Sequence, residues 1–141
     1  MTNYLKISVI DPDPDYLGIE ISASNARFSG TTKIYAGLDQ LTELAVVITG
    51  FPMSPKDERS YEFGTKNEGF AGGYCALRFY CRDRAGHAAA DIEIEDDNMF
   101  YSEATARFTI PILPAGVDEF VRVLQLVEQA QSGEAILEGE R

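Results

Sequence analysis

Most of this chain carries the alternating apolar and polar side chains that predict β-strands. In a half-buried strand successive side chains point to opposite faces, so apolar residues recur at every second position. Pro111 lacks the amide hydrogen that pairing inside a sheet requires, so we expect the strand that contains it to lie at a sheet edge. The segments with this period are residues 5–9, 17–23, 27–35, 61–63, 74–82, 88–95 and 104–112.

The segment from Tyr74 to Glu95 predicts a β-hairpin with a defined register. Its turn is the four-residue loop 83–86, in which Gly86 takes the left-handed conformation. In this register apolar side chains pair across the strands on one face, and side chains of opposite charge pair on the other face. A slip of one residue would destroy both patterns. The predicted pairs are Arg82 with His87, Phe79 with Ala90, Arg78 with Asp91 and Leu77 with Ile92.

Two segments have helical spacing instead. The first ends at the stop signal of Gly50 and Pro52, and the second follows Pro114. The apolar positions that repeat with a helical period are Leu38, Leu41, Leu44, Ala45 and Ile48 in the first segment, and Val117, Phe120, Val121, Leu124 and Val127 in the second.

These elements predict an α+β fold in the order β-β-β-α-β-β-β-β-α. We expect a mainly antiparallel sheet of about six to seven strands with two helices packed on one face. The length of 141 residues suits a single domain, which we assign to residues 1–131. Residues 132–141 are short and rich in glycine and glutamate, and we expect a flexible C-terminal tail.

The net charge of the chain indicates which kinds of partner it could bind. The chain has 23 acidic and 12 basic residues, a formal net charge of −11. Such a surface repels a phosphate backbone, so we expect no nucleic-acid binding. It favours encounter with a basic protein, although acidity can also serve solubility alone.

The chain predicts a cytoplasmic protein without membrane association. Residues 1–4 lead directly into a strand pattern rather than into a signal peptide, and no apolar run approaches the roughly 18 residues of a membrane span. Cys75 and Cys81 lie on one predicted strand, too far apart to pair, and we interpret them as free thiols of a reducing compartment.

The chain lacks the residue sets of the common catalytic and metal sites. His87 is the only histidine, and strand alternation places it on the opposite face from Cys81. Asp11, Asp13 and Asp15 fail the calcium-loop pattern, and the glycine-rich segment 69–73 fails the phosphate-loop patterns. We therefore predict no catalytic residue, no metal and no cofactor.

The acidic segment 91–103 is the candidate site. It contains six acidic residues and no lysine, and its aromatic residues suit an interface. A solvated turn whose aromatic side chains fold onto the core is an equal alternative. The residues that we expect to bind a partner are Asp91, Glu93, Glu95, Asp96, Asp97, Phe100 and Tyr101.

Several local patterns resemble a loose group of small bacterial α+β proteins that include immunity proteins of polymorphic toxin systems. The resemblance covers about residues 5–128 and implies a cytoplasmic protein that neutralises a toxin by binding it. The patterns are the strand-rich start, Leu38-Asp-Gln-Leu41-Thr-Glu-Leu44, Leu77-Arg-Phe79, Asp83-Arg-Ala-Gly86-His and Phe120-Val-Arg-Val-Leu124.

Three functional hypotheses follow. The leading one is a non-enzymatic protein-binding domain that uses the acidic hairpin and the polar sheet face to bind a basic partner. The second is a small-molecule-binding or enzymatic domain with a pocket near Lys66–Gly73. The third is a structural module that self-associates through a sheet edge.

Overall fold

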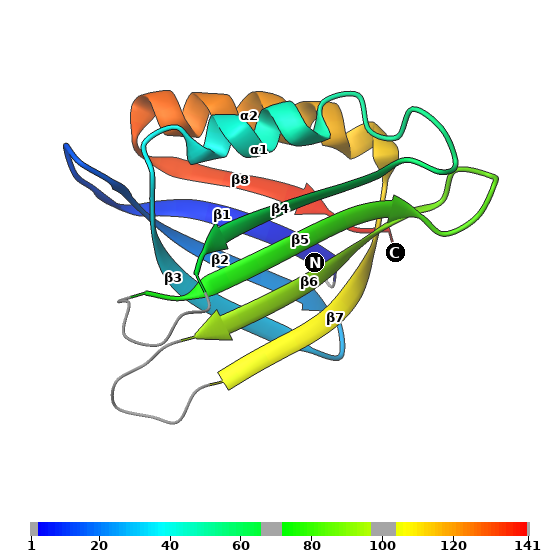
Figure 1. The fold of residues 1–141 in the computed structure, drawn as a ribbon, viewed down its shortest axis with the longest axis horizontal. Coiled ribbons are helices and arrows are strands. Elements are labelled where there is room, and N and C mark those ends of the chain that lie inside the picture. The colour runs from blue at the N-terminus through cyan, green and yellow to red at the C-terminus, as the bar shows by residue number, and fades with distance from the viewer. Residues whose placement is uncertain (1–2, 66–71, 97–103, 141) are drawn as a thin grey trace.

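The protein is an α+β fold of eight strands and two helices, seen in a computed structural model that describes residues 3–65, 72–96 and 104–140 (Figure 1). A single 3₁₀ turn, Pro114–Gly116, leads into the second helix. In chain order the elements are β1 (Asn3–Pro12), β2 (Leu17–Asn25), β3 (Ser29–Ala36), α1 (Gln40–Ile48), β4 (Glu58–Gly64), β5 (Tyr74–Cys81), β6 (Ala88–Asp96), β7 (Ala104–Ile112), α2 (Val117–Ala130) and β8 (Gly133–Glu138).

The predicted fold class is confirmed, but the strands form two antiparallel sheets rather than one. Sheet A has the order β3-β2-β1-β8 and sheet B the order β4-β5-β6-β7. Strands lie about 4.8 Å apart, so a seven-stranded sheet would be about 34 Å wide, whereas two helices of about 10 Å each cover only about 20 Å. When two smaller sheets pack with their apolar faces against each other, they bury the apolar surface that two helices are too narrow to cover.

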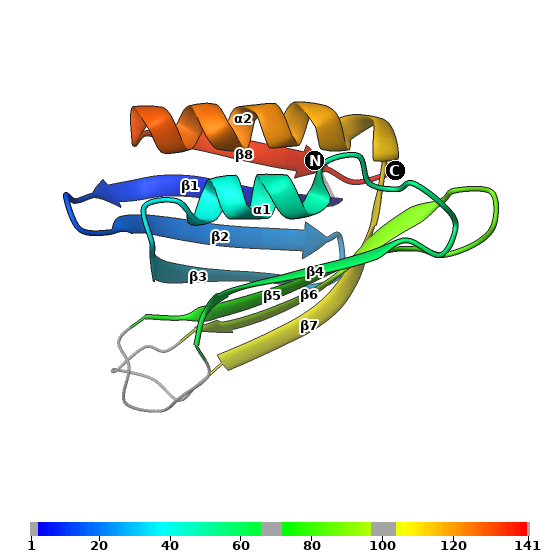
Figure 2. The same ribbon diagram turned by 45° about the horizontal axis from the view of Figure 1, so that its top comes forward.

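One core lies between the sheets and beneath the helices. The helices pack against each other, α2 against β8 and α1 against β4, so the pair closes one side of the space between the sheets (Figure 2). The buried apolar residues of both sheets and both helices form one continuous cluster, which includes Leu5, Ile19, Leu44, Phe79 and Phe120.

The predicted hairpin is confirmed in register. Strand β5 pairs with β6 through Phe79–Ala90, Leu77–Ile92 and Arg78–Asp91. The Arg82 amide donates to the His87 carbonyl at 2.7 Å, and Gly86 has φ of +89°. The prediction that the Pro111 strand lies at an edge is also confirmed, since β7 ends sheet B.

The prediction of a flexible tail at residues 132–141 is wrong. Residues 133–138 form β8, which pairs with β1 and buries Ala135 and Leu137. Gln131 and Gly133 both have positive φ, so the chain reverses direction directly after α2. The glycine and glutamate content suggested fraying, but pairing with a strand more than 120 residues away stabilises this segment.

The short helix α1 obtains its caps from other elements. Asp39, at its N-cap position, makes no side-chain capping bond. Instead, the Glu128 carboxylate of α2 accepts hydrogen bonds from the Thr42 amide at 3.0 Å and the Thr42 hydroxyl at 2.6 Å. At the other end, Arg59 of β4 donates to the carbonyls of Val47 and Thr49 at 3.0 and 2.6 Å. Tertiary contacts therefore satisfy both ends of the helix.

Close contacts join the sheets at two opposite corners. The Gly73 amide, just before β5, donates to the Lys33 carbonyl of β3 at 2.8 Å, and Thr32 Oγ1 donates to the Glu95 carbonyl at 2.9 Å. At the other corner Gly139 forms a bridge with Ile112, and the Glu140 amide donates to the Pro111 carbonyl. These contacts fix how sheet B lies on sheet A.

Candidate functional site

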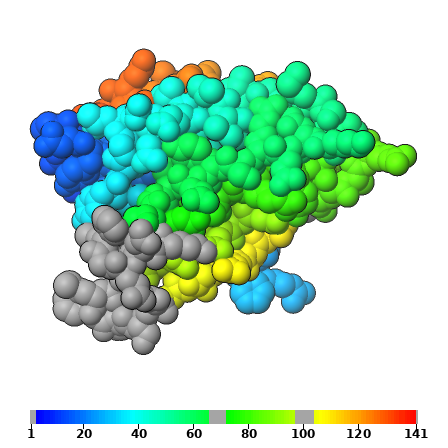
Figure 3. All heavy atoms as spheres, viewed as in Figure 1, coloured from blue at the N-terminus to red at the C-terminus, as the bar shows by residue number. Residues whose placement is uncertain are grey.

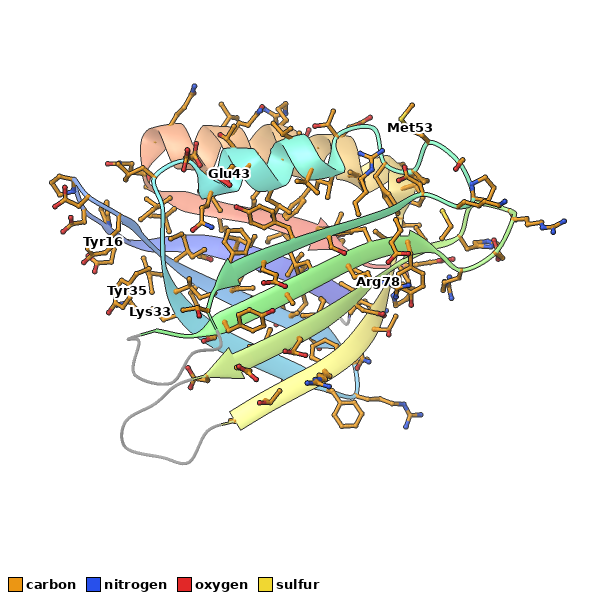
Figure 4. The ribbon with its side chains drawn as sticks, viewed as in Figure 1. Tyr16, Lys33, Tyr35, Glu43, Met53 and Arg78 are labelled. Atoms are coloured by element: carbon orange, nitrogen blue, oxygen red, sulfur yellow. The ribbon has the colours of Figure 1, made fainter. Side chains whose placement is uncertain are left out.

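The outer face of sheet B carries the candidate site, which we call the charged face. In this sheet paired residues share a face, and the pairing aligns two rows across all four strands: Ser60, Arg78, Asp91 and Thr109, and Glu62, Ala76, Glu93 and Arg107. Glu58 and Tyr80 flank them on one side, and Tyr74 and Glu95 on the other. This face, with Arg78 labelled, looks toward the viewer in Figure 4.

A depression of about 460 Å³ lies in the charged face. Ala76, which contributes only a methyl group, is surrounded by longer side chains on β4, β6 and β7. The polar residues that line the depression are Ser60, Glu62, Arg78, Asp91, Glu93, Arg107 and Thr109. The depression is therefore shallow, charged and built on strands, which hold side chains more rigidly than loops do.

Ion pairs order one end of the charged face. Arg78 contacts Glu58 at 2.7 Å and Asp91 at 2.9 Å, and its guanidinium carbon lies 4.3 Å from the centre of the Tyr80 ring. The Tyr80 and Thr109 hydroxyls donate to the same Asp91 oxygen at 2.9 and 2.7 Å. The Asp91 carboxylate is thus held in one orientation by three neighbours.

Negative charge dominates the other end. Among the described residues this end presents three carboxylates, at positions 62, 93 and 95, against the guanidinium group of Arg107. The whole face presents five carboxylates, with positions 58 and 91 added, against Arg78 and Arg107. Arg107 contacts Glu93 at 2.7 Å. Burial, together with Glu62, Glu93 and Glu95, raises the pKa of Tyr74 to about 12. The phenol therefore stays protonated, and the field around it favours a cation.

The structure divides the predicted binding residues. Asp91, Glu93 and Glu95 lie on the charged face, as alternation along β6 requires. Asp96 has the opposite orientation, toward sheet A, where Thr32 Oγ1 lies 3.4 Å from its Oδ1. Asp97, Phe100 and Tyr101 lie outside the described residues.

Sequence reasoning missed the parts of the face that neighbouring strands supply. Glu58 and Glu62 come from β4 and Arg107 from β7. The alternation in residues 104–112 places Arg107 on a polar face, but no local signal shows which strands are neighbours. Phe28 was also missed: it is 64% exposed, on a turn whose Asn25 side chain donates to the Thr109 carbonyl of β7.

The described histidine and thiols engage in separate contacts. His87 Nδ1 lies 2.6 Å from Asp83 Oδ2, within the β5–β6 turn. Cys75 is buried in the core, where burial and then the nearby Glu93 raise its thiol pKa to about 12. Cys81 Sγ lies 3.7 Å from the Ser54 carbonyl, and burial raises its pKa, with smaller contributions from Asp57 and Asp83. Both thiols are therefore held in their protonated form.

The pocket proposed near Lys66–Gly73 falls largely outside the described residues, since 66–71 are among those not described. Within residues 3–65, 72–96 and 104–140, neither helix is long and apolar enough to cross a membrane.

Comparisons with known proteins give no relative to set beside these residues. Neither the protein-family models nor the curated proteins nor the solved structures contain a significant match to the chain.

Proposed function

We propose that this protein is a non-enzymatic binding domain whose charged face captures a basic protein partner. The observation that carries the proposal is the excess of carboxylates on a strand-built face that has a depression at its centre. Complementary charge speeds diffusional encounter and selects among partners. A basic toxin domain, neutralised by binding in the cytoplasm, is the specific form suggested by the resemblance to immunity proteins.

The size of the charged face is compatible with a protein interface. Four strands about 4.8 Å apart and about eight residues long give an area of about 19 by 26 Å. A standard interface buries roughly 800 Å² of each partner. The face would thus supply the centre of such an interface, and the Phe28 turn at the β7 edge offers an exposed aromatic anchor at its rim.

Order within the face supports binding rather than acid–base chemistry. Asp91 is fixed by Arg78, Tyr80 and Thr109, and Glu93 contacts Arg107. These contacts hold the two carboxylates in defined orientations, which suits charge-assisted recognition of a cationic group. Side chains that are already ordered lose less conformational entropy when a partner binds.

Self-association through a sheet edge receives less support. At the β7 edge Pro111 has no amide hydrogen, and the Thr109 carbonyl already accepts a hydrogen bond from Asn25. At the β3 edge the Lys33 carbonyl accepts one from Gly73. Some of the backbone groups at each of these edges are thus missing or already hydrogen-bonded within the chain, which leaves fewer of them to pair with a second copy.

Capture from an extract of the source cells tests the proposal. We expect Glu62→Lys combined with Glu95→Lys to slow association with the captured basic protein on the order of tenfold, because four units of charge change on the charged face. The affinity of the wild-type complex should also fall as the salt concentration rises from about 0.05 to about 0.5 M, because added salt shortens the range of the electrostatic attraction.

The matched control is Glu20→Lys combined with Glu134→Lys, which makes the same charge change on the outer face of sheet A. This control should retain most of the association rate. Equal losses in the two double variants would refute a specific role for the charged face and leave only the effect of net charge.

A further inference from the structure

A second depression, separate from the one in the charged face, lies where the loop after α1 meets the β5–β6 turn. Its volume is about 500 Å³, and the residues that line it are Ser54, Pro55, Lys56, Cys81, Arg82, Asp83 and Arg84. We call it the tip pocket. The turn projects at the right of Figures 1 and 3, at the opposite end of β5 and β6 from Tyr74 and Glu95.

Hydrogen bonds fix both walls of the tip pocket. On one wall the Lys56 amide donates to Ser54 Oγ at 3.3 Å, the Asp57 amide to the Ser54 carbonyl at 3.1 Å, and the Met53 amide to Asp57 Oδ2 at 2.8 Å. On the other wall Asp83 Oδ1 accepts from the Ala85 and His87 amides at 2.9 and 3.2 Å. The Cys81 thiol lies 3.7 Å from the Ser54 carbonyl and links the walls.

The charge of the tip pocket is opposite to that of the protein as a whole. Among the described residues that line it, three are cationic, Lys56, Arg82 and Arg84, and one, Asp83, carries a carboxylate. Asp83 is already bound to His87, and this contact holds its pKa below the usual range. In a chain of net charge −11, a local excess of positive charge at a concave site is not explained by overall composition.

We propose that the tip pocket binds a small anion through a phosphate or carboxylate group, with Lys56 and Arg84 as the principal contacts. A volume of about 500 Å³ falls within the range of small-molecule sites. Guanidinium and ammonium groups recognise both kinds of anion through charge-assisted hydrogen bonds. The acidic remainder of the surface excludes a long nucleic acid and favours a ligand small enough to contact the pocket alone.

Arg82 has a secondary role, because its Nη2 already lies 3.3 Å from Glu140. This contact is exposed and stabilises little, so it can be exchanged for a ligand oxygen. Lys56 and Arg84 are exposed side chains, and their replacement leaves the core and both walls in place.

Titration of the whole protein with inorganic phosphate, and separately with citrate, followed by backbone amide NMR, tests the proposal. We expect saturable shifts confined to the amides of Ser54, Lys56 and residues 81–87 with at least one of the two anions. The anion that binds more tightly identifies phosphate or carboxylate as the preferred group. Lys56→Gln combined with Arg84→Gln should weaken binding by on the order of tenfold or more.

Lys6→Gln combined with Lys33→Gln is the control with the same loss of charge, since both lysines lie on sheet A. Equal weakening in the control would show that the anions respond only to net charge. Shifts that fail to saturate, or that spread over the whole surface, would overturn the site.

Discussion

Gly73→Ala is expected to lower the free energy of unfolding by about 3 kcal/mol, at the upper end of the usual cost of overpacking. A methyl group at this position would overlap Thr32 Oγ1 and lie 2.7 Å from the Glu95 carbonyl oxygen and 2.9 Å from Thr32 Cβ. Thr32 is itself buried and bonded to the Glu95 carbonyl. The methyl group can therefore be accommodated only if β3 moves away from sheet B.

Urea unfolding of the wild type and the variant measures this cost. Gly116→Ala is the control, because among the described residues its added methyl group would meet only Leu137 Cδ1, at an ordinary contact distance of 3.6 Å. The control should change stability by no more than about 0.5 kcal/mol. If Gly73→Ala were as stable as the control, the two sheets would not be joined at this corner as the structure has them.

Arg59→Met is expected to cost about 3 kcal/mol. The side chain of Arg59 is only 18% exposed and contacts Asp57 through Nε and Nη2, at 3.1 and 2.8 Å. The same guanidinium satisfies the carbonyls of Val47 and Thr49 at the end of α1. Its removal leaves a largely buried carboxylate and two helix-terminal carbonyls without their donor.

Arg122→Met is the matched control for Arg59→Met. Arg122 pairs with Glu119 on the exposed surface of α2, so its loss should not change the urea midpoint measurably. Equal midpoints for the two variants would contradict the capping of α1 by β4.

The local pattern of apolar and polar residues predicted those strands and helices in which this pattern repeats regularly. The β5–β6 register follows from alternation and from the turn at Gly86, which both act over a few residues. The helices follow from apolar spacing in the same way. Strand β8 has only six residues, and its two buried positions, Ala135 and Leu137, gain their burial by pairing with β1. No signal in the neighbouring sequence indicates that pairing.

The division into two sheets, and with it much of the candidate site, depends on which strands become neighbours. The sequence places Asp91, Glu93 and Glu95 on one face of a strand, and they do lie together. It also groups Asp96 with them, although alternation turns Asp96 toward Thr32. The contributions of Glu62 and Arg107 require the pairing of β4 and β7 with the hairpin, which is a long-range property.

Photocrosslinking in the source cells tests the function of the charged face most directly, because the crosslink captures a partner whatever its identity. A photoreactive phenylalanine derivative replaces Ala76, in the depression, or Ser8, on the outer face of sheet A. We predict a covalent adduct with a basic protein from position 76 and none from position 8. An adduct from position 8 alone, or no adduct from position 76 in a correctly folded protein, would contradict a binding role for the charged face.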